Sequence, residues 1–309
     1  HQLKNPQVYT PDYYSTYIPA VITRLLGLLW MSVVGLLLIM TLGRNYVRDF
    51  WAHQTTAFNL GVFRIALLLD FLLVFEPSLI NNMLGLTSEG LNYPLGYGLL
   101  KGLLPPPAWF VHGVWGLYNV LLPLALIGLF TRFTMPALTA AAFLVMLFPQ
   151  LVGKINHYHH MWLGLLFLSF APSGDALSVD ALIRRWRGKP NVDPHQYQLK
   201  YGRTFVYVWL TMGAVYFFPG FWKFAASGWA WAFSDNVQLK IIAKIFETGQ
   251  QPLIPLHNYP LLCKLGGLGA LIFEVGFPFA LVFPKARALF ALGGIGFHES
   301  NKVIMQISF

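Results

Sequence analysis

The chain has 309 residues, of which 56% are hydrophobic and only 11% are charged. Soluble domains carry about 25% charged residues, so this composition argues against a soluble enzyme and against a disordered chain. The single cysteine, Cys263, excludes an intrachain disulfide and a thiolate zinc site within this sequence. The class that remains is an integral membrane protein, in line with a mean hydropathy of +0.55.

Apolar runs recur along the whole chain, and a membrane-spanning helix needs about 20 such residues. They predict an all-α polytopic membrane bundle of about eight transmembrane helices. The predicted spans cover residues 18–42, 59–75, 108–130, 134–152, 160–171, 203–224, 261–283 and 286–309. We expect residues 1–17 to form an N-terminal tail and residues 18–309 to form one bundle, with surface loops at 77–107 and 228–260.

The excess of positive charge is explained by orientation in the membrane. Eleven of the 21 Lys and Arg residues fall in alternate loops, which the predicted spans place on one side. They are Arg44, Arg48, Arg132, Arg184, Arg185, Arg187, Lys189, Lys200, Arg203, Lys285 and Arg287. The positive-inside rule makes that side cytoplasmic. We expect the membrane to be a bacterial inner membrane. No folded basic domain surrounds the run at 184–189, so we expect the lipid bilayer as partner and no nucleic acid.

Ionisable groups inside apolar spans are costly and are therefore functional candidates. Arg64 and Asp70 lie in the second predicted span, where we expect pairing with neighbouring helices. The last span carries four polar residues about ten positions into an apolar stretch. They are His298, Glu299, Asn301 and Lys302. Such a cluster favours a polar cavity, although Glu299 and Lys302 could form a structural ion pair at i, i+3. Glu274 in the seventh span could face the same cavity.

Lys223 follows Pro219 near the end of the sixth span and is flanked by Trp222 and Phe224. A lysine desolvated by aromatic side chains has a lowered pKa and can act as a base. Alternatively, its ammonium could reach the headgroups at the end of the helix. The sequence leaves both interpretations open.

Three histidines stand close together at positions 157, 159 and 160. Their spacing invites a metal interpretation, but no Asp, Glu or Cys lies within ten residues of them. We therefore predict no metal site and expect single histidines to act as hydrogen-bonding or acid–base groups. Helical spacing places His157 and His160 on one face and His159 on another.

Three sequence blocks resemble the HTTM (horizontally transferred transmembrane) proteins and, with them, the vitamin K-dependent gamma-carboxylases. The blocks are NHYHHMWLGLLFLSFAPSGDALSVDAL, VYFFPGFWKF and GFHESNKVIMQISF, and the resemblance extends over residues 57–309. It implies a catalytic lysine at Lys223 and assisting histidines at His159 and His298. It also implies a pocket for a quinone, a lipid or a reduced vitamin K-like molecule around these three residues. From their positions in the spans, we expect the pocket residues to include Trp222, Glu274, Glu299, Asn301 and Lys302.

The sequence departs from the carboxylase pattern at the proposed site. Trp222 occupies the position of a second lysine that precedes the catalytic one, and His157 follows an asparagine, which makes it a rival to His159. The large lumenal domain of the carboxylases has no counterpart in this sequence, so we do not expect glutamate carboxylation.

Three functions are compatible with these features, and the sequence leaves open whether the protein is an enzyme. In the first, Lys223 deprotonates a reduced quinone. In the second, the bundle is a non-catalytic subunit or scaffold that binds other membrane protein subunits. In the third, it is a processing or immunity membrane protein for a secreted peptide. A transporter is a weaker interpretation, because the sequence shows no inverted repeat of the kind found in secondary transporters.

Overall fold

The computed structural model of the chain describes residues 43–74, 106–150, 159–190 and 192–305, and scattered positions between 19 and 41. Helices make up its regular structure. They are α2 (Arg44–Trp51), α3 (Ala57–Val74), α5 (Ala108–Ile127), α6 (Thr131–Gln150), α7 (His159–Ser169), α8 (Val179–Trp186), α9 (Leu199–Ser227), α10 (Ala230–Phe233), α11 (Asn236–Thr248), the 3-10 turn η4 (Leu256–Asn258), α12 (Pro260–Gly276), α13 (Phe279–Val282) and α14 (Pro284–Met305).

The predicted all-α class is confirmed for the described residues. Seven predicted spans coincide with observed helices, although the seventh is divided into α12 and α13. By length and composition, α5 and α9 are the two described helices that could cross a membrane. The number of spans therefore stays a prediction. The first predicted span lies largely outside the described residues, as does nearly all of the loop 77–107. The loop 228–260 contains α10, α11 and η4.

Helix α5 illustrates how the apolar pattern becomes a packed element. Pro107 precedes its first residue, and Gly128 ends it in the left-handed conformation at φ 72°. Its buried residues repeat at spacings of mostly three or four, which places them on one face. They are Val111, Val114, Tyr118, Leu121, Leu122 and Ala125. This face joins a core shared with α3, α6 and α7.

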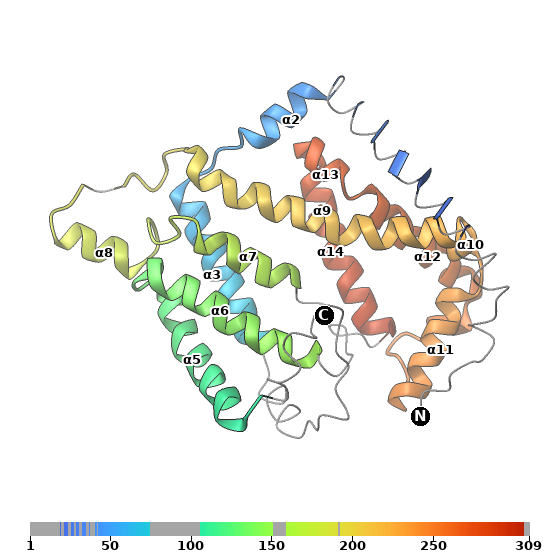
Figure 1. Cartoon of the computed structure of the whole chain (residues 1–309). Coiled ribbons are helices and arrows are strands. Elements are labelled where there is room, and N and C mark those ends of the chain that lie inside the picture. The colour runs from blue at the N-terminus through green and yellow to red at the C-terminus, as the bar shows by residue number, and fades with distance from the viewer. Residues whose placement is uncertain are drawn as a thin grey trace.

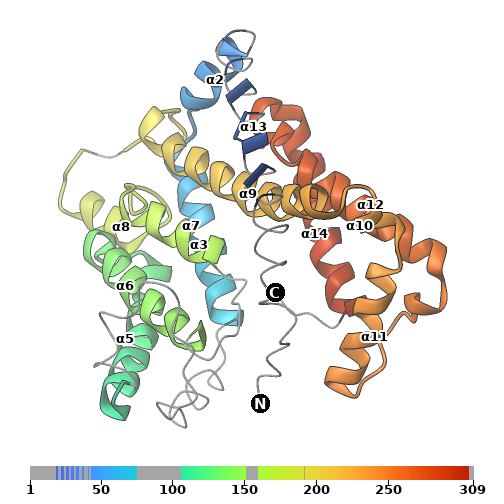
Figure 2. The ribbon, with the colours of Figure 1, turned by 45° about the vertical axis from the view of Figure 1, so that its right-hand side comes forward.

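Two groups of helices meet along α9 (Figures 1 and 2). The first half of α9 contacts α3 and α7, which pack with α5 and α6. Its second half contacts α12, which packs with α10 and α11 and touches α14. At 29 residues, α9 is about 43 Å long and extends beyond a hydrocarbon core of about 30 Å. It therefore supplies side chains to both groups.

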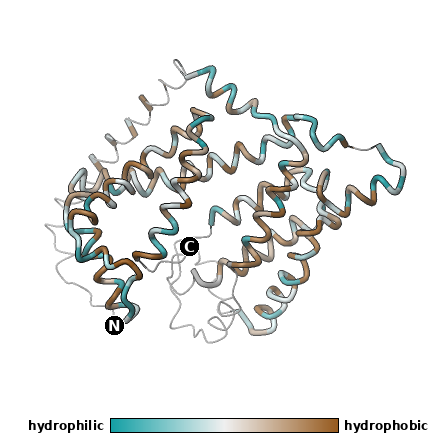
Figure 3. Tube along the Cα trace, turned by 180° about the vertical axis from the view of Figure 1, so that it is seen from behind, coloured by the Kyte–Doolittle hydropathy of each residue, from teal (hydrophilic) through white to brown (hydrophobic). Residues whose placement is uncertain are grey.

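The basic loops gather at one end of the molecule. Thr55 and Gln198 pair as an isolated antiparallel bridge, which joins the connection before α3 to the connection before α9. The Arg287 guanidinium lies over the rings of Phe50 and Trp209, at 5.7 and 5.6 Å. Burial lowers the pKa of the His53 imidazole, and the charge of Arg287 lowers it further. The connection between α8 and α9 is strongly hydrophilic (Figure 3).

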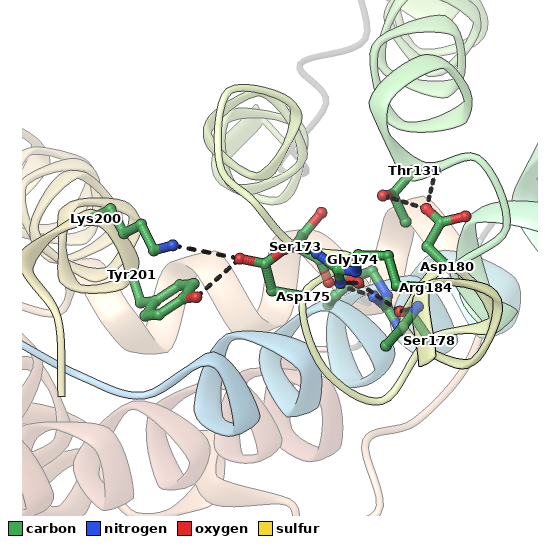
Figure 4. A network of polar contacts seen from close by, with 11 residues as sticks. Thr131, Ser173, Gly174, Asp175, Ser178, Asp180, Arg184, Lys200 and Tyr201 are labelled. Carbon is green, nitrogen blue, oxygen red and sulfur yellow. Dashed lines mark hydrogen bonds and ion pairs between the residues drawn. The ribbon is translucent and has the colours of Figure 1, made fainter. Parts of the chain in front are cut away.

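A polar network holds this end together (Figure 4). The Asp175 carboxylate accepts hydrogen bonds from Arg184 at 2.7 Å and from the Tyr201 hydroxyl at 2.8 Å, and it lies 3.5 Å from the Lys200 ammonium. The buried Arg64 donates to the backbone carbonyls of Ser173 and Leu177. Arg64 was expected to pair with a neighbouring helix. Its hydrogen bonds instead go to the loop that joins α7 to α8.

Asp180, the second residue of α8, ties that helix to the turn between α5 and α6. Its carboxylate accepts from the amides of Phe130 and Thr131 at 2.7 and 2.8 Å, and from the Thr131 hydroxyl at 2.7 Å. Phe130 has a φ of 49°, a backbone conformation that residues other than glycine rarely adopt. The carboxylate therefore satisfies the Phe130 amide in the turn and the first amide of α6, and it stabilises an otherwise unfavourable turn.

We expect Asp180→Asn to destabilise the protein by about 2 kcal/mol, because the charge-assisted hydrogen bonds to three donors are weakened. Thermal unfolding in detergent measures the loss. Asp49→Asn is the matched control, since Asp49 is 70% exposed and its ion pair with Arg48 is open to solvent. Equal effects of the two substitutions would contradict a structural role for Asp180.

Candidate functional site

A cavity of about 490 Å³ lies among α3, α7, α9, α14 and Phe277, the residue that follows α12. It is an open pocket whose walls combine aromatic rings with ionisable groups. Its lining comprises Asp70, His160, Val208, Trp209, Met212, Tyr216, Phe277, Phe290, Ala291, Gly294, Ile295, His298 and Glu299. Cavities with apolar walls and a few convergent polar groups are typical of binding sites for small molecules.

A hydrogen-bonded pair stands at the wall of this cavity. The Tyr216 hydroxyl lies 2.6 Å from Nε2 of His298, which joins α9 to α14. Tyr216 is 6% exposed, and its ring stacks on Phe277 at 4.6 Å between centroids. Phe273 meets the same ring edge-on at 5.1 Å. These contacts restrict the phenol to one orientation, so the polar pair is held in place by aromatic packing.

Lys223 and Glu274 form a second pair, on α9 and α12. The ammonium lies 2.6 and 2.7 Å from the two carboxylate oxygens. The Glu274 side chain is 6% exposed and that of Lys223 is 28% exposed, so the carboxylate is the more deeply buried partner. The ammonium also lies 4.8 Å from the centre of the Trp231 ring. A pair this buried is maintained because each charge offsets the desolvation of the other.

The geometry of α9 aligns these two pairs. Tyr216 and Lys223 are seven residues apart, which places them on one face of the helix about 10 Å from each other. Gly220 lies between them, where an added Cβ would come within 2.5 Å of the Glu274 Cβ. The glycine therefore allows α12 to approach α9 closely. Phe273, which precedes Glu274 in α12, and Phe277, the residue after α12, both pack against Tyr216.

The structure brings together some of the predicted site residues and separates others. His298 and Glu299 line the cavity, whereas Lys223 and Glu274 lie outside its lining. His159 is exposed and lies outside the lining, and its neighbour His160 contributes instead. His157 lies outside the described residues.

The remaining predicted pocket residues lie away from the cavity lining. Trp222 is 54% exposed. Asn301 is half-buried and Lys302 is exposed, both further along α14 than His298. Among the residues that the structure describes, no three His, Cys, Asp or Glu side chains are grouped to hold a metal ion.

Sequence reasoning missed Tyr216 and the aromatic walls formed by Trp209 and Phe290. A signal for Tyr216 was present, because it stands seven residues before Lys223 and so shares its helical face. The pairing of Lys223 with Glu274 carried no comparable signal. These residues are 51 positions apart and meet only because α9 and α12 pack together.

The family described as "HTTM domain" matches residues 52–309 of the chain. No match was found among curated proteins or among solved structures. The matched segment includes α3 to α14 and so contains both the cavity and the Lys223–Glu274 pair. Because the match covers well over half of the chain, this protein belongs to the HTTM family of membrane proteins, as its sequence motifs predicted.

Proposed function

We propose that this protein binds a reduced quinone in the cavity and removes a proton from it. The observation that carries the proposal is the Tyr216–His298 pair in a cavity with aromatic walls. A hydroquinone is a flat aromatic ring with hydroxyl groups. Its ring would pack against Trp209, Phe277 and Phe290, and one hydroxyl would hydrogen-bond with Tyr216 or His298.

Lys223 is the proposed base. Its ammonium first transfers one proton to Glu274, which leaves an uncharged amine beside a carboxylic acid. The amine then accepts the hydroquinone proton, and the ligand becomes an oxyanion. The amine lies outside the cavity lining, two helical turns or about 10 Å along α9 from Tyr216, so the proposal requires the proton to be relayed over that distance, from Tyr216 toward the Lys223–Glu274 pair. Molecular oxygen would accept the two electrons and two protons of the hydroquinone, yielding quinone and hydrogen peroxide.

We further infer a bundle of about eight spans in a bacterial inner membrane, with the basic end in the cytoplasm. Two observations support this topology. The helices α3, α5, α6, α7, α9, α12 and α14 follow the predicted apolar segments. Contacts of α8 with the α5–α6 turn, of α14 with α2, and of Thr55 with Gln198 bring the basic loops to one end, which the positive-inside rule assigns to the cytoplasm.

Purified protein in lipid nanodiscs tests the proposed function with menadiol as the probe. We expect His298→Ala to weaken anaerobic menadiol binding at least tenfold, because a menadiol hydroxyl loses a hydrogen-bond partner in the cavity. Lys223→Ala should leave binding within about threefold of the unmodified protein but lower oxygen-dependent menadiol oxidation at least 100-fold, consistent with loss of a general base. Equilibrium dialysis and oxygen consumption are the two measurements.

His195→Ala is the control, because His195 is exposed in the connection between α8 and α9. Absence of menadiol binding to the unmodified protein would refute the quinone site and favour the scaffold interpretation. If the Lys223→Ala variant bound menadiol and oxidised it at an unchanged rate, the quinone site would stand but Lys223 would be rejected as the base.

A further inference from the structure

Helix α8 presents an unusual combination of side chains on the surface of the basic end. Leu182 is 65% exposed and Trp186 is 86% exposed, one helical turn apart. Arg185, Arg187 and Lys189 are exposed beside them. Large apolar side chains and cations thus share one short segment. An amphipathic helix with this composition is typical of a membrane–water interface.

Internal contacts fix the orientation of α8. Arg184 donates to Asp175 at 2.7 Å and to the Gly174 carbonyl at 2.9 Å, so it points into the network (Figure 4). The adjacent Arg185 is exposed and has no ion pair within the described part of the chain. After the helix, Gly188 adopts a φ of 64°, and the Lys189 amide donates to the Arg184 carbonyl at 3.1 Å. This turn keeps Lys189 beside the last turn of α8.

The turn between α5 and α6 extends this surface. It is joined to α8 through Asp180, whose amide also donates to the Gly128 carbonyl at 3.0 Å. Phe130 is 60% exposed and Phe133 is 72% exposed, with Arg132 exposed between them. The exposed residues of this turn and those of α8 and the turn after it form one surface, which we call the α8 surface. It consists of Phe130, Arg132, Phe133, Leu182, Arg185, Trp186, Arg187 and Lys189.

We propose that the α8 surface binds anionic phospholipids, with its aromatic and leucine side chains among the acyl-chain ends and its four cations on the headgroup phosphates. The nearby carboxylates of Asp175 and Asp180 are engaged inside the network, so they do not neutralise these cations. Tryptophan favours the interface, and basic side chains are attracted to an anionic leaflet. A nucleic-acid partner would match the cations but not the exposed Leu182 and Phe133.

A nitroxide spin label at Leu182 tests the proposal. The label is attached to Leu182→Cys in a Cys263→Ala background, and the full chain is reconstituted into vesicles of phosphatidylcholine with about 30% phosphatidylglycerol. Collision rates with oxygen, which partitions into lipid, are compared with those of a water-soluble nickel chelate. We expect oxygen collisions to exceed nickel collisions at least threefold. The same label at Gln196, in the exposed connection before α9, should show the reverse.

Charge variants identify the lipid contribution. We expect the oxygen-to-nickel ratio at Leu182 to fall at least threefold in the triple variant Arg185→Gln/Arg187→Gln/Lys189→Gln. The same fall is expected for the unsubstituted surface in vesicles of phosphatidylcholine alone. Lys240→Gln/Lys244→Gln on α11 is the control, because α11 and α8 lie on opposite sides of the molecule (Figure 1). A ratio dominated by nickel in the anionic vesicles would overturn the proposal. Low collision rates with both reagents would also overturn it, since they indicate a covering protein. These outcomes are independent of quinone binding.

Discussion

Replacing Glu274 with glutamine is expected to destabilise the folded protein by about 2–4 kcal/mol. The substitution keeps the size of the side chain but leaves the Lys223 ammonium without its counter-charge. Removal of one member of a buried ion pair leaves an uncompensated charge, and this is the main cost. The partial exposure of Lys223 places the value toward the lower end of that range. Reversible unfolding in detergent, followed by tryptophan fluorescence, measures it.

The pair formed by Lys244 and Glu247 on α11 provides a matched control. Its nitrogen–oxygen distance of 2.7 Å is nearly the same, but the Glu247 side chain is 66% exposed. We therefore expect Glu247→Gln to cost less than about 0.5 kcal/mol. The double variant Lys223→Met/Glu274→Leu should be more stable than the sum of the single losses predicts, because neither charge then remains buried. Strict additivity would contradict a buried, coupled pair.

Replacing Gly202 with alanine should destabilise the protein by about 3 kcal/mol or more. A Cβ at this position would lie 1.9 Å from the carbonyl oxygen of His53 and 2.7 Å from its carbon. Both are backbone atoms, so a side-chain rotation cannot relieve the clash. The Thr55–Gln198 bridge limits movement of the same segment. The first turn of α9 would have to separate from the connection before α3.

Gly269→Ala distinguishes this clash from a general effect of alanine in helices. No atom lies within 4 Å of a Cβ built at Gly269 in α12. Alanine should therefore stabilise the protein there by about 0.5–1 kcal/mol through its higher helix propensity. Parallel melting curves should shift in opposite directions. A Gly202→Ala variant that melts with the unmodified protein would show that α9 does not approach the His53 backbone this closely.

The ion pair bears on the role proposed for Lys223 as a base. Its ammonium is directed to the buried Glu274 carboxylate. The proposed base is consequently a two-residue unit. Any change in Glu274 should affect proton transfer as well as stability.

The sequence by itself determined the helical class, the approximate bounds of most helices and the family. These features depend on local information. Apolar runs of membrane-spanning length select helices, because backbone groups in such runs must be satisfied within the segment. Three short blocks, one that contains His159 and two around Lys223 and His298, predicted the HTTM family. The grouping of basic loops followed from charge counting along the chain.

Only the tertiary structure decided which polar residues meet. Glu274 was expected in the cavity with His298, but it pairs with Lys223, because Gly220 allows α12 to pack against that part of α9. His160 rather than His159 lines the cavity, because the rotation of α7 about its axis depends on packing with α3, α6 and α9. Long-range packing sets these contacts, and residues 51 or 82 positions apart carry no local signal of their meeting.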